Sequence, residues 1–281
     1  MKKNILILLL AAVSGQLQAQ HPVDSLIAAE KNFAAYSKQY STKEAFEAYI
    51  DSNSWMFEDG APVKAMAYWA KREKKPALLQ WWPLFADIAG SGDFGFTTGP
   101  WTYQARAGDS IIARGQYATV WHRNEKGQWK FLADLGADDV PETKDTACLT
   151  GYINTWGDKP ESSPISKMLD AEKSLIRSTS QKEYRDYDRM HWYRQSVAHD
   201  FYALLIRNGQ SPAWDTDSYY RIMRQMPDKI GYTILGSGIA SSGDMGYVFG
   251  ATLINGKKEN YLRIWRFEKN KWKLTLEVLR Y

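Results

Sequence analysis

Two halves of this chain repeat the same short patterns in the same order. Four patterns occur twice: SGDFGF at 91–96 and SGDMGY at 242–247, AEK at 29–31 and 171–173, Tyr-x-x-x-Trp at 117–121 and 261–265, and Trp-Lys at 129–130 and 272–273. The two copies of each pattern lie about 145 residues apart, which is far longer than the repeat of a solenoid or a propeller. The pattern therefore predicts a duplicated domain, in which each candidate residue can be compared with its counterpart.

Each half has the same predicted order of elements, with helices first and strands after them. Hydrophobic periodicity predicts helices at 24–37, 43–50 and 63–74, and again at 166–178, 181–190 and 216–225. Strands are predicted at 78–89, 94–105, 110–123 and 129–135, and again at 230–240, 245–254, 259–268 and 272–279. This order predicts an α+β fold with two tandem domains, each a curved antiparallel sheet folded over N-terminal helices.

Composition divides the chain into a leader, two domains and a linker. Residues 1–19 place Lys2 and Lys3 before a short apolar run, which predicts a cleaved signal peptide and a periplasmic or secreted location. We expect the first domain at 22–140, a linker rich in Pro, Ser and Asp at 141–163, and the second domain at 164–281. The apolar run is too short to span a bilayer, so we expect no membrane contact after cleavage.

Charge and composition exclude several classes of partner. Of the 36 Lys and Arg residues, two lie in the leader, and 32 Asp and Glu residues nearly balance the rest. No dense basic block suggests a nucleic-acid partner. The single cysteine excludes an internal disulfide, and no motif predicts a metal or a cofactor. The chain is rich in aromatic residues, with 12 Trp, and this excess over two small cores suggests cavity walls.

One glutamate lies at the centre of the apolar face of the first helix in each half. On a helical wheel, Glu30 falls within the apolar arc of its helix, and Glu172 falls within the arc of the corresponding helix. A carboxylate buried among apolar side chains is costly unless it is paired or lines a wet cavity. Two interpretations stay open: a buried ion pair or hydrogen bond, and a pocket carboxylate with a raised pKa that acts as an acid or base.

A second pair of carboxylates occurs in the last strand of each half. Asp134 follows Trp129 and Lys130 at the same spacing at which Glu277 follows the second Trp-Lys pair. Strict alternation places each carboxylate on the face opposite its Trp, with the lysine. That face favours a surface or interface role, while a pocket role stays open.

Aromatic side chains alternate along the preceding strand, and they complete the candidate site. Tyr117 and Trp121 share one face in the first half, and Tyr261, Arg263 and Trp265 share one face in the second. These residues, with Trp55, are candidate ligand-binding residues or ordinary core. Arg263 replaces Thr119 of the first half and could hold an anionic group of a ligand, so two pockets would differ chemically.

Both halves resemble the nuclear transport factor 2-like superfamily, which includes SnoaL-like cyclases and ketosteroid isomerase. The resemblance rests on the AEK helix, the loose match of 57–62 with 207–212, the SGD strand start and the Tyr-x-x-x-Trp strand. It implies a cone with an apolar pocket, and two copies that pack on each other as an internal pseudo-dimer. The family's acid-base residues do not map securely onto this chain.

Together these observations predict an exported protein that binds a small apolar or aromatic molecule. If the chain is an enzyme, we expect a cofactor-independent isomerase or lyase of the cyclase or dehydratase type, with Glu30 or Glu172 as its base. Two alternatives stay open: a non-catalytic interaction or scaffold module with solid cores, and an extracellular sugar binder with exposed stacking rings.

Overall fold

The computed structural model describes residues 22–138, 163–180, 186–197 and 203–281, which form two units with one sheet each. The first unit contains α1 (Pro22–Gln39), α2 (Thr42–Tyr49), β1 (Trp55–Glu58), β2 (Ala61–Lys64), α3 (Ala65–Ala70), β3 (Leu78–Trp81), β4 (Phe85–Ile88), β5 (Phe94–Gln104), β6 (Ile111–Arg123) and β7 (Trp129–Asp138). The second contains α4 (Ile165–Thr179), α5 (Asp186–Ser196), β8 (Leu204–Arg207), β9 (Gln210–Ala213), α6 (Thr216–Gln225), β10 (Gly231–Ile239), β11 (Met245–Ile254), β12 (Lys257–Glu268) and β13 (Lys271–Leu279). The predicted α+β class and its duplication are confirmed.

The two sheets have matching topologies. The first has the strand order β2-β1-β7-β6-β5-β3, with β4 also paired to β5, and the second has the order β10-β11-β12-β13-β8-β9. Strand pairs are antiparallel except β1 with β7 and β8 with β13, which are parallel. The hairpins β1–β2 and β8–β9 were not predicted, because strands of four residues are too short for a periodic signal. The predicted strand at 78–89 is two strands, since Pro83 lacks an N–H for the ladder.

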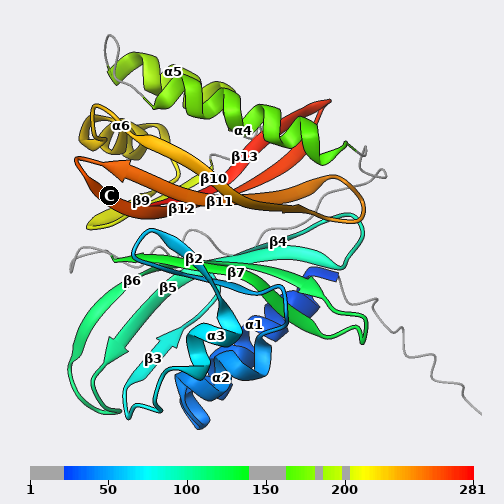
Figure 1. Ribbon diagram of the computed structural model, residues 1–281, viewed down its shortest axis with the longest axis vertical. Coiled ribbons are helices and arrows are strands. Elements are labelled where there is room, and N and C mark those ends of the chain that lie inside the picture. Colours follow the sequence, from blue (N-terminus) through cyan, green and yellow to red (C-terminus); the bar gives the residue numbers. More distant parts are fainter. Residues whose placement is uncertain (1–21, 139–162, 181–185, 198–202) are drawn as a thin grey trace, which may run out of the picture.

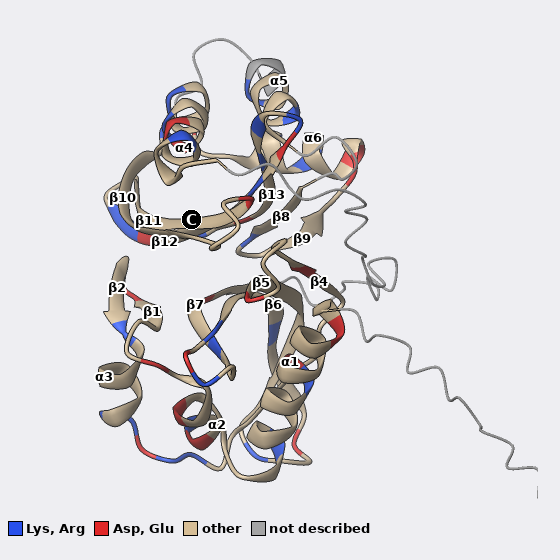
Figure 2. Cartoon of the chain, turned by 90° about the vertical axis from the view of Figure 1, so that its right-hand side faces the viewer, with Lys and Arg blue, Asp and Glu red and all other residues tan. Residues whose placement is uncertain are grey.

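Figure 1 shows four layers, in which the two sheets lie face to face and the helices of each unit cover the opposite face of its own sheet. The face of each sheet that its helices cover is called its inner face. A cluster of buried apolar side chains joins the sheets, including Phe94, Phe96 and Val120 of the first and Tyr247, Phe249 and Ile264 of the second. The rings of Phe57 and Phe249 lie 5.3 Å apart across this boundary. Basic and acidic residues are distributed over both units (Figure 2).

The repeated SGD loops contact each other where the two sheets meet. The backbone N–H of Ser91 donates to the hydroxyl of Ser242 at 3.1 Å. The hydroxyl of Ser241 donates to the carboxylate of Asp93 at 3.0 Å. The most conspicuous repeated motif therefore connects the two units and lies outside their interiors.

The first helix of each unit carries its glutamate to the inner face of the sheet. The buried residues of α1 recur every three or four positions, as expected of an amphipathic helix: Val23, Leu26, Glu30, Phe33 and Ser37. The buried residues of α4 have the same spacing: Met168, Glu172, Leu175 and Thr179. The predicted central positions of Glu30 and Glu172 on these faces are confirmed.

Strand β7 contains a β-bulge that changes which residues face the helices. Phe131 and Ala133 pair with consecutive residues of β6 although they are two apart, so Leu132 is an extra residue. Such a bulge interrupts the alternation of side chains between the two faces of a strand. Strand β13 carries the equivalent bulge at Thr275.

Several predictions fall outside the described residues. The structure does not describe residues 1–21 and 139–162. The predicted signal peptide at 1–19 lies in the first of these segments. The predicted linker at 141–163, with Cys148, lies in the second except for its last residue. These segments and the exact domain boundaries stay predictions. In the described part of the chain, no helix is long and apolar enough to cross a membrane.

Candidate functional site

The first unit contains a cavity of about 350 Å³ between its helices and the inner face of its sheet. Six aromatic side chains from α1, α2, β3, β5 and β6 form most of the wall: Phe33, Phe46, Trp81, Trp101, Tyr103 and Tyr117. Four polar or charged side chains also line it: Asp134, Asp138, Asn208 and Arg280. The last two belong to the second unit, so both units enclose this cavity.

Asp134 reaches the cavity because of the bulge in β7. Strict alternation predicts that it lies opposite Trp129, but the extra residue Leu132 moves Asp134 to the same inner side as Trp129. The sequence prediction about its face was therefore wrong, since a bulge of one residue leaves no periodic signal. Glu277 is moved to the inner side in the same way by Thr275.

Asp134 is one of the two carboxylates that the cavity can present to a ligand. Its side chain keeps some accessible surface, and the hydroxyl of Thr119 donates a hydrogen bond to it at 2.6 Å. Burial raises the pKa of Asp134 to about 6, although the hydrogen bond from Thr119 acts to lower it. The hydroxyl of Tyr117 is buried at the same cavity and has no hydrogen-bond partner among the described residues.

Glu30 lies behind the cavity wall, where three donors surround it. The indole N–H of Trp121 donates to it at 3.1 Å, and Trp81 and Thr97 donate the other two hydrogen bonds. Burial raises the pKa of Glu30 to about 7 despite these donors. Its side chain is completely buried and does not line the cavity, so a ligand can reach Asp134 more directly.

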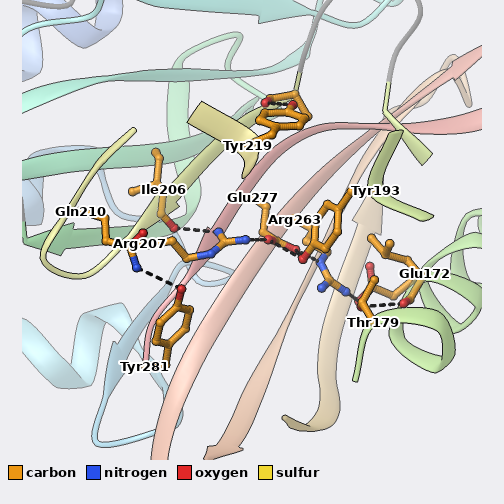
Figure 3. A network of polar contacts seen from close by, with 12 residues as sticks. Glu172, Thr179, Tyr193, Ile206, Arg207, Gln210, Tyr219, Arg263, Glu277 and Tyr281 are labelled. Carbon is orange, nitrogen blue, oxygen red and sulfur yellow. Dashed lines mark hydrogen bonds and ion pairs between the residues drawn. The ribbon is translucent and has the colours of Figure 1, made fainter. Parts of the chain in front are cut away.

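The corresponding interior of the second unit contains a buried ionic network (Figure 3). Arg263 donates to Glu172 at 2.8 Å and to Glu277 at 2.6 Å. Arg207 also donates to Glu277. The hydroxyl of Tyr193 lies 2.9 Å and 3.1 Å from the two carboxylate oxygens of Glu277. These five side chains are completely buried.

Charge compensation sets the pKa values in this network. Burial acts to raise the pKa of Glu277, but Arg207 and Arg263 outweigh it and hold the pKa below its usual range. Burial also raises the pKa of Glu172, which Arg263 only partly offsets. Arg263 was predicted as a handle for an anionic ligand; it binds two glutamates of its own unit.

The remaining candidate ligand-binding residues pack inside or between the two units. Trp265 donates to Glu172 at 3.0 Å, as Trp121 does to Glu30, and both indoles are buried. Tyr261 is buried with its ring 5.1 Å from the guanidinium of Arg263. Trp55 does not line the cavity: its ring packs 5.7 Å from a phenylalanine of the second sheet. Trp55 starts the unpredicted strand β1, so its direction could not be read from the sequence.

Several residues of this arrangement were not singled out from the sequence: Trp81, Thr97, Tyr193, Arg207, Asn208 and Arg280. Arg207 had a detectable signal, because a basic residue that ends the apolar run Leu-Leu-Ile needs a buried partner. The others depend on which strands become neighbours. Within the described residues, no group of three or more His, Cys, Asp or Glu side chains is placed to hold a metal ion.

Solved structures similar to this chain match one unit at a time. No family model matches the chain, and no curated protein matches it. A nuclear transport factor 2-like protein of unknown function from Shewanella oneidensis MR-1 is 14% identical, with a TM-score of 0.33, over 42% of this chain and 100% of that chain. A nuclear transport factor 2-like protein from Cytophaga hutchinsonii is 16% identical, with a TM-score of 0.32, over 41% and 96%.

A ketosteroid isomerase-like protein from Erwinia carotovora atroseptica is 12% identical, with a TM-score of 0.31, over 41% of this chain and 93% of that chain. These similarities concern the fold of a single domain. In this chain, helices followed by a curved sheet occur twice in the same order. Each half of the chain therefore has the α+β arrangement of helices and a curved sheet that its repeated elements predict.

Proposed function

We propose that the first unit binds a small, largely apolar or aromatic molecule. The observation that carries this proposal is the cavity of about 350 Å³, walled by aromatic rings and provided with the carboxylate of Asp134 and the hydroxyl of Tyr117. Ligand pockets have volumes of roughly 300–1,000 Å³ and combine apolar walls with a few polar groups. A hydroxyl without a partner in such a wall favours a ligand that supplies one.

The two alternatives fit this unit less well. A scaffold module with solid cores would have no cavity of ligand size, whereas the first unit has one. A sugar binder would expose its aromatic rings in an open groove, but Trp81 and Tyr117 are only 7% and 6% exposed. Enclosed rings favour a compact apolar ligand.

The test is mass spectrometry of small molecules that co-purify with the protein under native conditions. Ala113→Trp places an indole at the cavity wall, and Leu253→Trp places the same indole at an exposed position of the second unit. We expect Ala113→Trp to lose the bound molecule and Leu253→Trp to keep it. Equal retention by the two variants would contradict the proposal.

A second candidate function is cofactor-independent proton transfer by Asp134, of the isomerase, cyclase or dehydratase type. The specific observation is that this cavity carboxylate has its pKa raised to about 6, close to the range in which a general base is effective. Asp134 would take a proton from a carbon next to a carbonyl and return it to another carbon. Tyr117 would donate a hydrogen bond to the carbonyl oxygen as negative charge develops there.

This chemistry is tested by hydrogen exchange of a bound ketone, 2-tetralone, in D₂O, followed by NMR. We expect the protein to accelerate exchange next to the carbonyl, and Asp134→Asn to reduce the rate by at least about 100-fold. Leu253→Trp serves as the control and should keep the full rate. Exchange by Asp134→Asn as fast as that of the unaltered protein would exclude Asp134 as the base.

We also propose that residues 1–19 are removed during export and that the two units together replace a dimer of single domains. The basic start and short apolar run support export, and the apolar cluster shared by both sheets supports the internal pseudo-dimer. The mass of the chain recovered from the periplasm or medium tests the cleavage. Sedimentation equilibrium should find one chain per particle.

A further inference from the structure

The mouth of the cavity carries an arginine from the second unit. Arg280, which follows β13, lines the cavity together with Asn208 from the β8–β9 turn. Asp138, at the exposed end of β7, marks the mouth, four residues beyond Asp134. At 3.3 Å per residue, these two positions on β7 lie roughly 13 Å apart.

The second unit holds this mouth in place through hydrogen bonds to the backbone of Asp138. The N–H of Gly209 donates to the carbonyl of Asp138 at 2.8 Å, and the N–H of Asp138 donates to the side-chain oxygen of Asn208 at 3.3 Å. The N–H of Arg280 donates to the carbonyl of Asn260 at 3.2 Å. Both segments of the second unit that border the cavity are therefore anchored to regular strands.

The charge of Arg280 is only weakly compensated by the described residues. Its Nε lies 3.4 Å from Glu259 and forms no hydrogen bond of good geometry, while Glu259 lies closer, at 2.7 Å, to Lys257. Its side chain is 33% exposed, so it can turn toward a group at the mouth. By contrast, Arg207 and Arg263 of the same unit are committed to buried glutamates.

We infer that the cavity is specific for molecules with an apolar ring system and one anionic group, such as a carboxylate or sulfonate, which Arg280 binds at the mouth. The inference rests on the proposed function, because it assigns the ligand class of the same cavity. A guanidinium recognises such planar or tripodal anions through several N–H donors. The second unit, whose own arginines Arg207 and Arg263 bind buried glutamates, thus contributes specificity to the first.

Asp134 sets the direction in which such a ligand lies. An anionic group near this carboxylate would be repelled, so it belongs beside Arg280, and the ring system extends inward along the aromatic wall. Asp134 and the hydroxyl of Tyr117 then face an uncharged polar group, a hydroxyl or a carbonyl, at the other end.

Two fluorescent probes with the same ring skeleton separate charge from shape. 8-Anilinonaphthalene-1-sulfonate carries a sulfonate, and N-phenyl-1-naphthylamine lacks it. We expect the full mature chain to bind the sulfonate probe more tightly, and Arg280→Gln to weaken that binding about tenfold while changing neutral-probe binding less than about twofold. Arg280→Lys should retain part of the preference, and Arg224→Gln on the exposed side of α6 should retain all of it.

The outcomes distinguish the two proposals. Loss of both probes in Ala113→Trp, or in Leu79→Trp if the first variant does not fold, places them in the cavity. If the neutral probe binds there but Arg280→Gln leaves the sulfonate probe unchanged, the inference about Arg280 is overturned and the binding function stands. If neither probe binds in the cavity, both are overturned.

Discussion

The same substitution at the two corresponding glutamates is expected to have opposite effects on stability. Glu30→Gln and Glu172→Gln each remove one buried carboxylate of similar shape from the first helix of a unit. Glu30 is held by three neutral donors, while Glu172 is paired with the guanidinium of Arg263. The first substitution removes a charge that burial disfavours, and the second leaves an arginine with less compensation.

For Glu30, the magnitude follows from its pKa. Burial raises that pKa from 4.5 to about 7, and a change of one in pKa corresponds to about 1.4 kcal/mol. The resulting contribution to the free energy of unfolding is about 3 kcal/mol. Because the pKa of the folded state is the higher one, this stability is fully present below pH 4.5 and is lost as the pH rises to about 7. Glu30→Gln should therefore be close to the unaltered protein at pH 4.5 and more stable by up to about 3 kcal/mol at pH 8.

For Glu172, the cost comes from its partner. Removal of one member of a buried ion pair typically costs about 3–5 kcal/mol, because the remaining charge stays desolvated. Arg263 keeps Glu277 at 2.6 Å, and a neutral glutamine also relieves the burial that raises the pKa of Glu172, so the expected loss is at most about 3 kcal/mol at pH 8. The two variants should thus differ by roughly 3–6 kcal/mol at this pH.

The assay is urea unfolding followed by tryptophan fluorescence at several values between pH 4.5 and 8. The measured quantity is the difference in unfolding free energy between each variant and the unaltered protein, so titration of the groups that do not interact with the substituted glutamate cancels. Asp134 does interact with Glu30, since burial and the charge of Asp134 both raise the pKa of Glu30. A Glu30→Gln variant that is destabilised as much as Glu172→Gln at pH 8 would refute the reasoning. So would a difference for Glu30→Gln that does not change with pH.

Three further substitutions test other parts of the structure. Thr119→Val removes the hydrogen bond that lowers the pKa of Asp134, so that pKa should rise above 6 in an NMR titration; an unchanged value would contradict the assignment. Arg266→Gln breaks the buried ion pair with Asp87, 2.7 Å long, that joins the two units, and should cost about 3–5 kcal/mol in urea unfolding. Adding Asp87→Asn should recover much of this loss, and no recovery would argue against the pair. Tyr117→Phe removes a hydroxyl without a partner and should change stability by less than about 0.5 kcal/mol while weakening ligand binding in fluorescence titrations.

The fold could be predicted from the sequence because its signals are long or repeated. Helices of 18 and 15 residues keep a buried stripe at every third or fourth position, and Glu30 and Glu172 stand in it. The long strands alternate regularly, as Tyr117 and Trp121 show by sharing the inner face. Because the domain is duplicated, each element is predicted from two independent stretches of sequence.

The chemistry of the site was harder to predict, since it depends on single residues between elements. One extra residue, Leu132, moves Asp134 from the predicted outer face to the cavity. The four-residue strand β8 is too short for periodicity, yet its Arg207 completes the ionic network. Arg280 lines a cavity of the other unit, and no local pattern reports a contact between units.

The two interiors of this duplicated fold differ in how they accommodate their buried carboxylates. Both copies keep two carboxylates on the inner side: Glu30 and Asp134 in the first, Glu172 and Glu277 in the second. In the second, Arg263 and Arg207 neutralise both carboxylates and occupy the interior.

In the first unit, Thr119 occupies the position that Arg263 occupies in the second. Strand β1 pairs with β7 as β8 pairs with β13, so Glu58 occupies the position that corresponds to Arg207. Glu58 turns outward to Arg72 at 2.7 Å, so neither position supplies a cation to the interior. The first unit therefore accommodates its carboxylates by raising their pKa values, and Asp134 lies at the wall of its cavity. A carboxylate with a raised pKa at a cavity is the arrangement that the proposed ligand would use. The proposal therefore assigns binding to the unit that has Thr119 and not to the unit that has Arg263.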